Sequence, residues 1–275
     1  MTVSMVVSLY TAARQKVVVE EQGIPSPDVS FTPAILYFLG SVAVMALVLF
    51  FIPLNKLRIV FRILFALMYA WGTLIIVWLV WPSQIDYVVY AIAIAAGLTW
   101  LFWAKIWLHD VLLLITLSAA GSIFGFLFSP WTFMIVMLVI ALYDFLAVRF
   151  GFMVWMADKL SGTTALPAFV FPKEIKDWRL SIYTISVGEL AKTEREKREY
   201  SILGGGDIAF PLMLTTSVFF ADDMVKAIIV GVFAFAGLMS AFYIQMTFLK
   251  SKPMPALPPI AAFSLVGLLV VGFLW

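Results

Sequence analysis

The chain has 275 residues, of which 64% are hydrophobic and 12% charged, and its mean hydropathy of +1.06 excludes a water-soluble globular protein. The net charge of +2 comes from basic residues confined to a few loops, a pattern of membrane proteins that gives no indication of nucleic-acid binding. The chain has no cysteine, which excludes disulfides and cysteine metal sites, and its single histidine, His109, is too few for a histidine-rich metal site. We therefore predict neither a metal nor a cofactor.

Eight apolar segments are long enough to cross a membrane, because a span needs about 20 residues. In chain order they cover roughly 33–53, 59–81, 85–106, 111–129, 131–148, 202–220, 224–249 and 255–275. Residues 1–13 are too short to cross and are typical of the end of a helix whose beginning is missing or poorly defined. The sequence thus predicts an all-α polytopic membrane protein with eight clear transmembrane helices and a partial or truncated first helix.

One long connection separates the fifth and sixth of these spans. It ends in a mixed-sign run of charges at 189–199, which is typical of a solvated helix face or a flexible loop. One side of the membrane collects fifteen of the eighteen Lys and Arg residues. The long connection divides the chain into N-terminal transmembrane helices at 1–151, a loop at 152–201 and C-terminal transmembrane helices at 202–275. Because membrane proteins keep an excess of Lys and Arg in the cytoplasm, we predict that the loop is cytoplasmic and that the C-terminus is outside.

Two aspartates, Asp144 and Asp207, lie inside segments that otherwise belong in lipid. A carboxylate at membrane depth is costly unless it faces a partner or a water-filled cavity, so it indicates a functional site. No third Asp or Glu is expected at a comparable depth. Asp144 lies five residues before Arg149 and Asp207 about five residues into the next span, so both are roughly 7 to 8 Å deep from the same side. The sequence predicts a catalytic pair.

Glycines and prolines surround the predicted pair. Gly204, Gly205 and Gly206 remove side chains beside Asp207, so that another backbone or a substrate can approach, although loop glycines at a helix start would look the same. Pro211 cannot donate the helical hydrogen bond to the Asp207 carbonyl and is expected to loosen that turn. Four prolines within 253–259 are expected to prevent a regular helix start, so that this segment lines a cavity or forms a stiff linker.

Two further features have structural interpretations. The glycines of the GxxxG motif at 121–125 indicate close helix packing rather than catalysis. His109 and Asp110 fall between two predicted spans, where we expect a solvent-exposed pair in a cytoplasmic turn.

These residues resemble the presenilins, the catalytic subunits of γ-secretase, and their archaeal homologues. Residues 143–148 (YDFLAV) resemble the YD motif of the family's sixth helix, residues 203–207 (LGGGD) the GxGD motif of the seventh, and residues 255–257 (PAL) the PAL motif of the ninth. Residues 166–170 (LPAFV) resemble a short hydrophobic motif of the loop after the sixth helix. The order and spacing of the motifs agree with the family pattern, whereas the complete first helix of that pattern is not visible here.

The resemblance implies a presenilin-like bundle of nine transmembrane helices and an aspartyl protease that cuts the transmembrane helices of other proteins in the lipid bilayer. It implies catalysis by Asp144 and Asp207. The active-site motif residues that it implies are Tyr143, Gly204, Gly205, Gly206, Pro255, Ala256 and Leu257. Signal peptide peptidases share the three motifs in an inverted orientation, so the distribution of Lys and Arg favours the presenilin branch.

Two carboxylates a few ångströms apart do not both ionise readily in an apolar surrounding, so the pair is expected to share one proton. The ionised member would activate a water and the protonated member would assist the scissile carbonyl. A proton-coupled transporter would also place carboxylates at depth, but it would more often show repeated pairs of broken helices, and none is visible. A non-catalytic scaffold would have no reason to bury two carboxylates at matched depth, so a transporter or channel is the alternative to a protease.

Overall fold

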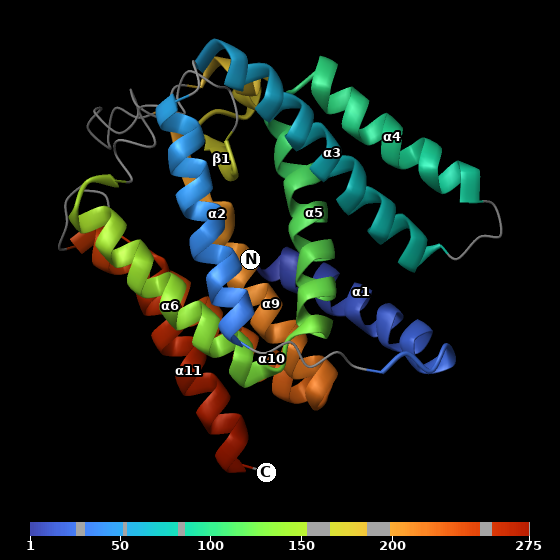
Figure 1. Cartoon of the computed structure of the whole chain (residues 1–275), viewed down its shortest axis with the longest axis vertical. Coiled ribbons are helices and arrows are strands. Elements are labelled where there is room, and N and C mark those ends of the chain that lie inside the picture. Colours follow the sequence, from blue (N-terminus) through green and yellow to red (C-terminus); the bar gives the residue numbers. More distant parts are fainter. Residues whose placement is uncertain are drawn as a thin grey trace. The chain divides into compact units, whose positions relative to one another are not determined.

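The computed structural model describes residues 1–25, 31–51, 54–81, 86–152, 166–185, 199–247 and 255–274. The helices in this part of the chain are α1 Thr2–Glu21, α2 Phe31–Phe51, α3 Leu54–Val80, α4 Asp86–Phe102, α5 Ile106–Leu127, α6 Pro130–Arg149, α9 Gly205–Ala221, α10 Met224–Thr247 and α11 Leu257–Leu274 (Figure 1). Two short strands, β1 Ala168–Pro172 and β2 Tyr200–Gly204, and two 3-10 helices, η1 Ile175–Arg179 and η2 Ile182–Thr184, complete the described elements.

The helix bounds agree with the predicted spans, and the described residues form nine α-helices, as the predicted fold class requires. The first helix differs from expectation. It continues well beyond residue 13 and forms 20 residues of unbroken helix, Thr2–Glu21. Its second half carries charged residues, which hid its helical continuation from a search for apolar runs.

The chain divides into two compact units. The first contains Met1–Tyr37, Leu117–Leu146 and Gly206–Trp275, and the second contains Phe38–Thr116 and Ala147–Gly205. The first unit therefore includes α1, α10, α11 and nearly all of α6 and α9. The second includes α3, α4, the first half of α5 and both strands.

Small and hydroxyl side chains pack the helices of the first unit together. Ser8 of α1 donates a hydrogen bond to the Ser118 carbonyl of α5 at 3.2 Å, and Thr216 of α9 donates to the Gly121 carbonyl at 2.6 Å. Interhelical bonds of this kind satisfy polar groups that lipid cannot. Gly121 lies against Ser8, and Gly125 lies against Thr216, with no room for a side chain at either glycine. The prediction that the GxxxG motif serves helix packing is confirmed.

We expect Gly125→Ala to lower the stability of the protein by about 1–3 kcal/mol, because overpacking a tight core costs this much. A Cβ at this position would overlap the Thr216 side chain and lie 2.9 Å from the Ser217 backbone nitrogen. Thermal unfolding in detergent measures the effect. The matched control is Gly272→Ala in α11, where a Cβ would meet no atom within 4 Å. Equal melting temperatures for the two variants would contradict close packing at Gly125.

The second unit contains a helical hairpin and a small sheet. Helices α3 and α4 pack along each other, as Figure 1 shows. Strands β1 and β2 pair antiparallel, with Ala168 opposite Gly204 and Pro172 opposite Tyr200. The long connection, which the sequence analysis treated as a loop or a solvated helix face, thus supplies β1 and the start of β2, and the rest of β2 takes the first residues of the span predicted at 202–220. Residues 189–198 of the mixed-sign run lie outside the described residues.

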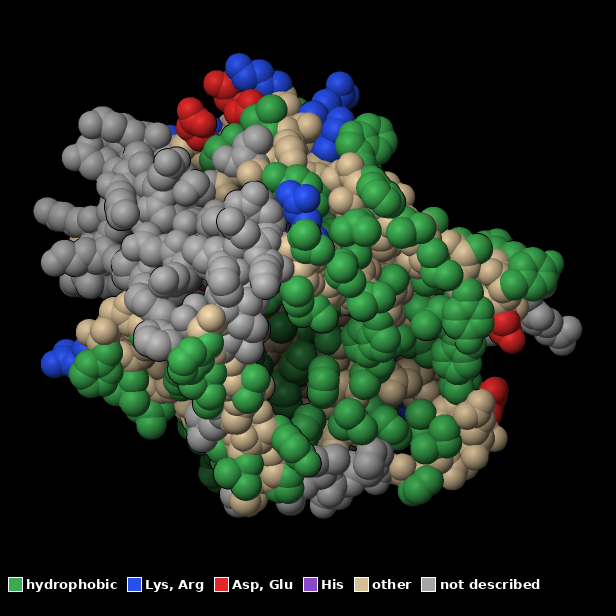
Figure 2. Space-filling view, turned by 45° about the horizontal axis from the view of Figure 1, so that its top comes forward, with side chains coloured by type: hydrophobic (Ala, Val, Ile, Leu, Met, Phe, Trp, Pro, Cys, Tyr) green, Lys and Arg blue, Asp and Glu red, His purple; other side chains and the backbone are tan. Residues whose placement is uncertain are grey.

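Much of the described surface is apolar. Figure 2 shows hydrophobic side chains over most of the visible described surface and charged side chains in small groups. Large side chains such as Leu36, Leu67 and Val232 are more than half exposed. Four described helices are long and apolar enough to cross a membrane: Ile59–Val80, Ile106–Leu127, Pro130–Arg149 and Met224–Thr247. Such surfaces favour lipid over water as their surroundings.

Candidate active site

Asp144 is held by a backbone group from another helix. It lies near the end of α6 and only 8% of its surface is exposed. Its Oδ2 accepts a hydrogen bond from the backbone N–H of Leu257 at 3.3 Å. A buried carboxylate is costly without such a donor. Leu257 is the first residue of α11, so the Asp144 contact joins α6 to the start of α11.

The local sequence explains why this N–H is free to bind Asp144. The first N–H groups of a helix have no partner within the helix. Pro258 and Pro259 follow Leu257 and carry no N–H, and their fixed backbone angle suits the first helical turn. The Leu257 N–H is therefore the free donor that this helix start presents. The expectation that the prolines prevent a regular helix start was wrong for the described residues, because prolines in the first turn remove only bonds that the helix does not make.

Asp207 lies in the first turn of α9. The N-terminus of a helix carries a partial positive charge and free N–H groups, which favour an acidic side chain. Gly206 beside it is exposed, and a Cβ there would meet only the Phe210 ring, at 3.4 Å. Packing of the described protein therefore does not require a glycine at this position. The absence of a side chain at Gly206 leaves the backbone beside Asp207 accessible. Pro211 lies within α9, which continues through it.

The two aspartates interact. Both belong to the first unit, and the Asp144 carboxylate acts electrostatically on the Asp207 carboxyl. Their helices also meet through a contact between the Phe133 and Phe210 rings, whose centroids are 6.5 Å apart. The structure thus brings together two carboxyl groups and one backbone N–H donor. Two such carboxyl groups can share one proton, and the Leu257 N–H can keep the Asp144 carboxylate oriented.

The remaining motif residues lie in different places. Tyr143 is half-buried next to Asp144, and Pro255 and Ala256 are half-buried just before α11. Gly204 ends β2, and the Gly205 N–H donates to the Pro167 carbonyl at 2.9 Å, both within the second unit. These two glycines precede Asp207 directly in the chain. The structure therefore makes the GxGD motif the junction of a strand and a helix.

The prediction for His109 and Asp110 was wrong. They lie near the start of α5, where His109 has no exposed surface and Asp110 is only 7% exposed. Asp110 is therefore a third carboxylate inside an apolar helix, and it is buried, which contradicts the expectation of only two. Both side chains hydrogen-bond β1. The signal that was overlooked is the apolar sequence on both sides of the pair, which continues the helix through it.

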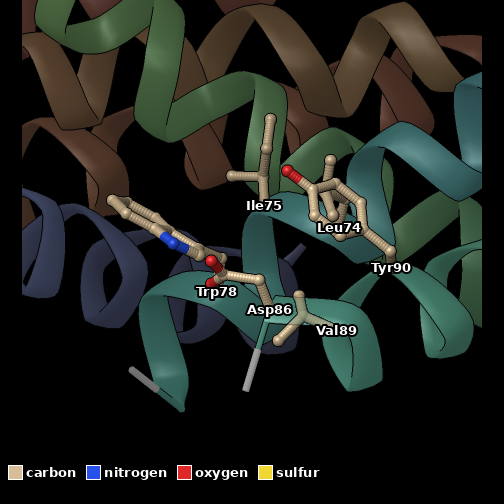
Figure 3. Close-up of a pocket in the computed structure, with 6 residues that line it drawn as sticks. All are labelled: Leu74, Ile75, Trp78, Asp86, Val89 and Tyr90. Atoms are coloured by element: carbon tan, nitrogen blue, oxygen red, sulfur yellow. The ribbon is translucent and has the colours of Figure 1, made fainter. Parts of the chain in front are cut away.

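One open pocket in the second unit lies between the end of α3 and the start of α4 (Figure 3). Its volume is about 290 Å³, and it is lined by Leu74, Ile75, Trp78, Asp86, Val89 and Tyr90. It contains a single carboxylate, which cannot divide a proton with a second acid as a catalytic pair does. We assign this pocket no role in catalysis. Within the described ranges, no group of three or more acidic or histidine side chains is arranged to hold a metal ion.

The whole chain, residues 1–275, matches the family model described as signal-peptide peptidase, presenilin aspartyl protease. The chain belongs to this family. Two solved structures of a presenilin family intramembrane aspartate protease share its fold. The structure in space group C222 is 19% identical, with a TM-score of 0.60, and the match covers 98% of this chain and 97% of the other. The structure in space group P2 is 17% identical, with a TM-score of 0.62, and the match covers 99% and 97%. Curated protein sequences gave no significant match.

Membership of this family decides the class of activity. The protein is a multi-pass integral membrane protein and an intramembrane aspartyl protease, an aspartic endopeptidase. This confirms the resemblance drawn from the three motifs. It also favours a protease over the transporter or channel that the sequence analysis left as the alternative.

Proposed function

We propose that Asp144 and Asp207 are the catalytic pair of this protease and that it hydrolyses peptide bonds within or near the transmembrane helices of other proteins. The observation that carries the proposal is the buried Asp144 carboxylate, which accepts from the Leu257 N–H and lies on a helix that contacts the Asp207 helix through the Phe133 and Phe210 rings. The test is cleavage of a single-span peptide by the purified protein, with the fragments identified by mass spectrometry.

The chemistry follows from one proton shared by two carboxyl groups. The ionised carboxylate removes a proton from a water molecule as the water oxygen attacks the scissile carbonyl carbon. The protonated carboxyl group donates a hydrogen bond to the carbonyl oxygen, which becomes negative in the tetrahedral intermediate. A proton then passes to the amide nitrogen, the C–N bond breaks, and the pair again holds one proton. The Leu257 N–H keeps the Asp144 carboxylate oriented through these steps.

The substrate must be extended where it is cut. A helix hides its carbonyls in internal hydrogen bonds, and an unwound segment in lipid needs other partners for its backbone. Addition of the unwound segment to an exposed strand edge supplies those partners. We propose that the backbone of β2 before Gly204 and the segment around Ala256 hold the extended substrate.

Disulfide trapping tests this proposal, and the absence of native cysteine makes single-cysteine variants unambiguous. In an Asp207→Asn background, we expect Ile202→Cys and Ala256→Cys each to capture a single-span peptide that carries one cysteine near its cleavage site. The control is Val232→Cys, which is 55% exposed on α10. Capture at neither position, or capture equal to the control, would reject these two segments as the substrate site.

We propose the orientation predicted from the charges, with the 152–201 loop in the cytoplasm, the C-terminus outside, and the membrane helices divided between 1–151 and 202–275. We expect a membrane-impermeant maleimide applied to intact cells to label Asp222→Cys, which follows α9, and to label Lys176→Cys only after permeabilisation. Both native side chains are solvent-accessible, at 38% and 75% of their surface. The reverse labelling pattern would indicate the inverted, signal-peptide-peptidase orientation.

A further inference from the structure

Two buried side chains of α5 bind the backbone of β1. His109 Nε2 lies 3.1 Å from the Ala168 carbonyl oxygen, and Asp110 Oδ1 accepts a hydrogen bond from the Val170 N–H at 3.1 Å. All four residues belong to the second unit. The catalytic mechanism uses neither side chain. Burying a charged or polar group costs free energy unless hydrogen bonds compensate, so these contacts indicate a structural role for both side chains.

The ladder between the strands shows which edge of β1 these contacts occupy. The Lys173 N–H donates to the Glu199 carbonyl at 3.0 Å, and the Gly205 N–H donates to the Pro167 carbonyl at 2.9 Å. Hydrogen-bonded pairs alternate along an antiparallel ladder. In this register the backbone groups of odd-numbered residues of β1 face β2, and those of Ala168 and Val170 face away from it. His109 and Asp110 therefore occupy the outer edge of β1.

The two side chains take the place of a third strand. An added strand would donate an N–H to the Ala168 carbonyl and offer a C=O to the Val170 N–H. The imidazole supplies the donor and the carboxylate supplies the acceptor. An open edge of this kind otherwise invites another chain to pair with it. The outer edge of β1 is thus closed by side chains of the protein itself.

Neighbouring aromatic residues hold the imidazole in the required state. A carbonyl oxygen can only accept, so Nε2 of His109 carries the proton. Nδ1 then accepts from the Tyr69 hydroxyl, which lies 3.0 Å away. The Tyr69 ring meets the imidazole edge-on at 88°, with the ring centroids 5.8 Å apart. Trp100 packs against both rings, and both it and Tyr69 have no exposed surface.

Strand β2 has no comparable side-chain contacts on its outer edge among the described residues. By the same alternation, the backbone groups of Tyr200 and Ile202 face away from β1. The sheet has two strands among the described residues, so no described strand pairs with this side of β2. The chain continues from β2 through Gly205 and Gly206 to Asp207. A displacement of β1 would move β2 and, with it, the backbone that leads to this aspartate.

We propose that His109 and Asp110 are positioning residues that close the outer edge of β1 and so set which peptide bond of an extended substrate is cut. The proposal rests on the proposed protease function and on substrate addition to β2. With the outer edge of β1 closed, an extended substrate can pair only with the outer edge of β2. The fixed sheet then holds the substrate strand in one register. Without the closure, β1 shifts and the cleavage position spreads over neighbouring bonds.

The experiment compares variants that keep or lose each hydrogen bond. Asp110→Asn keeps an acceptor for the Val170 N–H and Asp110→Leu removes it, whereas His109→Gln keeps a donor and His109→Leu removes it. Thr116→Val is the matched control, because this buried residue of α5 donates its hydrogen bond within its own helix, to the Leu112 carbonyl. The two readouts are amide hydrogen exchange in the peptide that contains β1 and the distribution of products cut from a single-span peptide.

We expect the two Leu variants to exchange the β1 amides about tenfold faster, because a buried N–H or C=O has lost its partner. We also expect them to produce fragments from adjacent bonds. The Asn, Gln and Val variants should keep both wild-type readouts. An unchanged product distribution in folded Leu variants, or an Asn variant as impaired as the Leu variant, would overturn the proposal. The histidine pair provides an independent comparison should Asp110→Leu not fold.

The two proposals fail in different ways. If the wild-type protein cut no peptide, the proposed function would fail, and amide exchange would still report on the edge of β1. Unchanged exchange in both Leu variants would overturn the edge closure, whatever the activity. If the wild-type protein cuts the peptide and the Leu variants give the same products, the protease function is supported and the positioning role is rejected.

Discussion

Asp144→Asn and Asp207→Asn are each expected to lower the rate of peptide cleavage by about 10³-fold or more, since positioned acid and base groups contribute about 10²–10⁴-fold. An amide can neither take a proton from water nor hold the proton that the pair divides. Each substitution therefore disables both halves of the cycle, and the double variant should be no worse than either single variant. Fragment formation from a single-span peptide, measured by mass spectrometry with purified protein in detergent, gives the rates.

Asp86→Asn provides the matched control for these variants. It removes a carboxylate from the α4 pocket and leaves the pair intact, so the cleavage rate should not change. The melting temperature in detergent shows whether each variant is folded. A folded Asp144→Asn or Asp207→Asn variant that still cuts the peptide at the wild-type rate would exclude that residue from catalysis.

Leu257→Pro is expected to reduce cleavage about 10- to 100-fold while the protein remains folded, because a hydrogen bond to a charged group contributes about 1.5–3 kcal/mol. The substitution removes the N–H that binds Asp144 at 3.3 Å. Proline is tolerated at the first position of a helix, where its missing N–H makes no helical bond. The loss should therefore appear in the rate of cleavage rather than in the helical content, which circular dichroism measures.

The control for Leu257→Pro separates the backbone from the side chain. The Leu257 side chain is buried, with only 3% of the residue exposed, and proline also shortens it. Leu257→Ala shortens the side chain and keeps the N–H, so it should retain more activity than Leu257→Pro. Equal losses in the two variants would assign the effect to side-chain packing and would contradict the backbone role.

The transmembrane helices were predictable because lipid imposes a local rule. A span must be long, apolar and internally hydrogen-bonded, and each of these properties is visible in a continuous stretch of sequence. The predicted segment 131–148 and the helix Pro130–Arg149 differ by a single residue at each end. The first helix was harder to predict, because the second half of Thr2–Glu21 is charged and does not read as a span.

The candidate catalytic residues were predictable for a related reason. An aspartate in an apolar segment is rare enough to be noticed. The GxGD and PAL motifs are each a short run of consecutive residues, so each is visible in the sequence. The donor that holds Asp144 was not predictable, because it is a backbone N–H from Leu257, 113 residues away. A backbone group leaves no signature in the residue type, and only the fold decides which one a carboxylate meets.

His109 and Asp110 show the other limit of sequence analysis. Their polar side chains between two apolar segments suggested an exposed turn, whereas the structure buries them against a strand about 60 residues later. The strand itself lies within a connection that carries no strong periodic pattern. The pairing of β1 with β2 and the contacts of α5 with β1 are long-range, so they depend on the packing of several elements at once.

The sequence by itself determined the membrane class, the helical spans and the presence of Asp144 and Asp207 inside apolar segments, since each depends on the cost of placing local groups in lipid. The tertiary structure decided which groups meet. It brought Asp144 to the first N–H of α11 and gave the outer edge of β1 to His109 and Asp110. These partnerships satisfy buried polar groups across distant segments, and that requirement is met only when the helices and strands pack together.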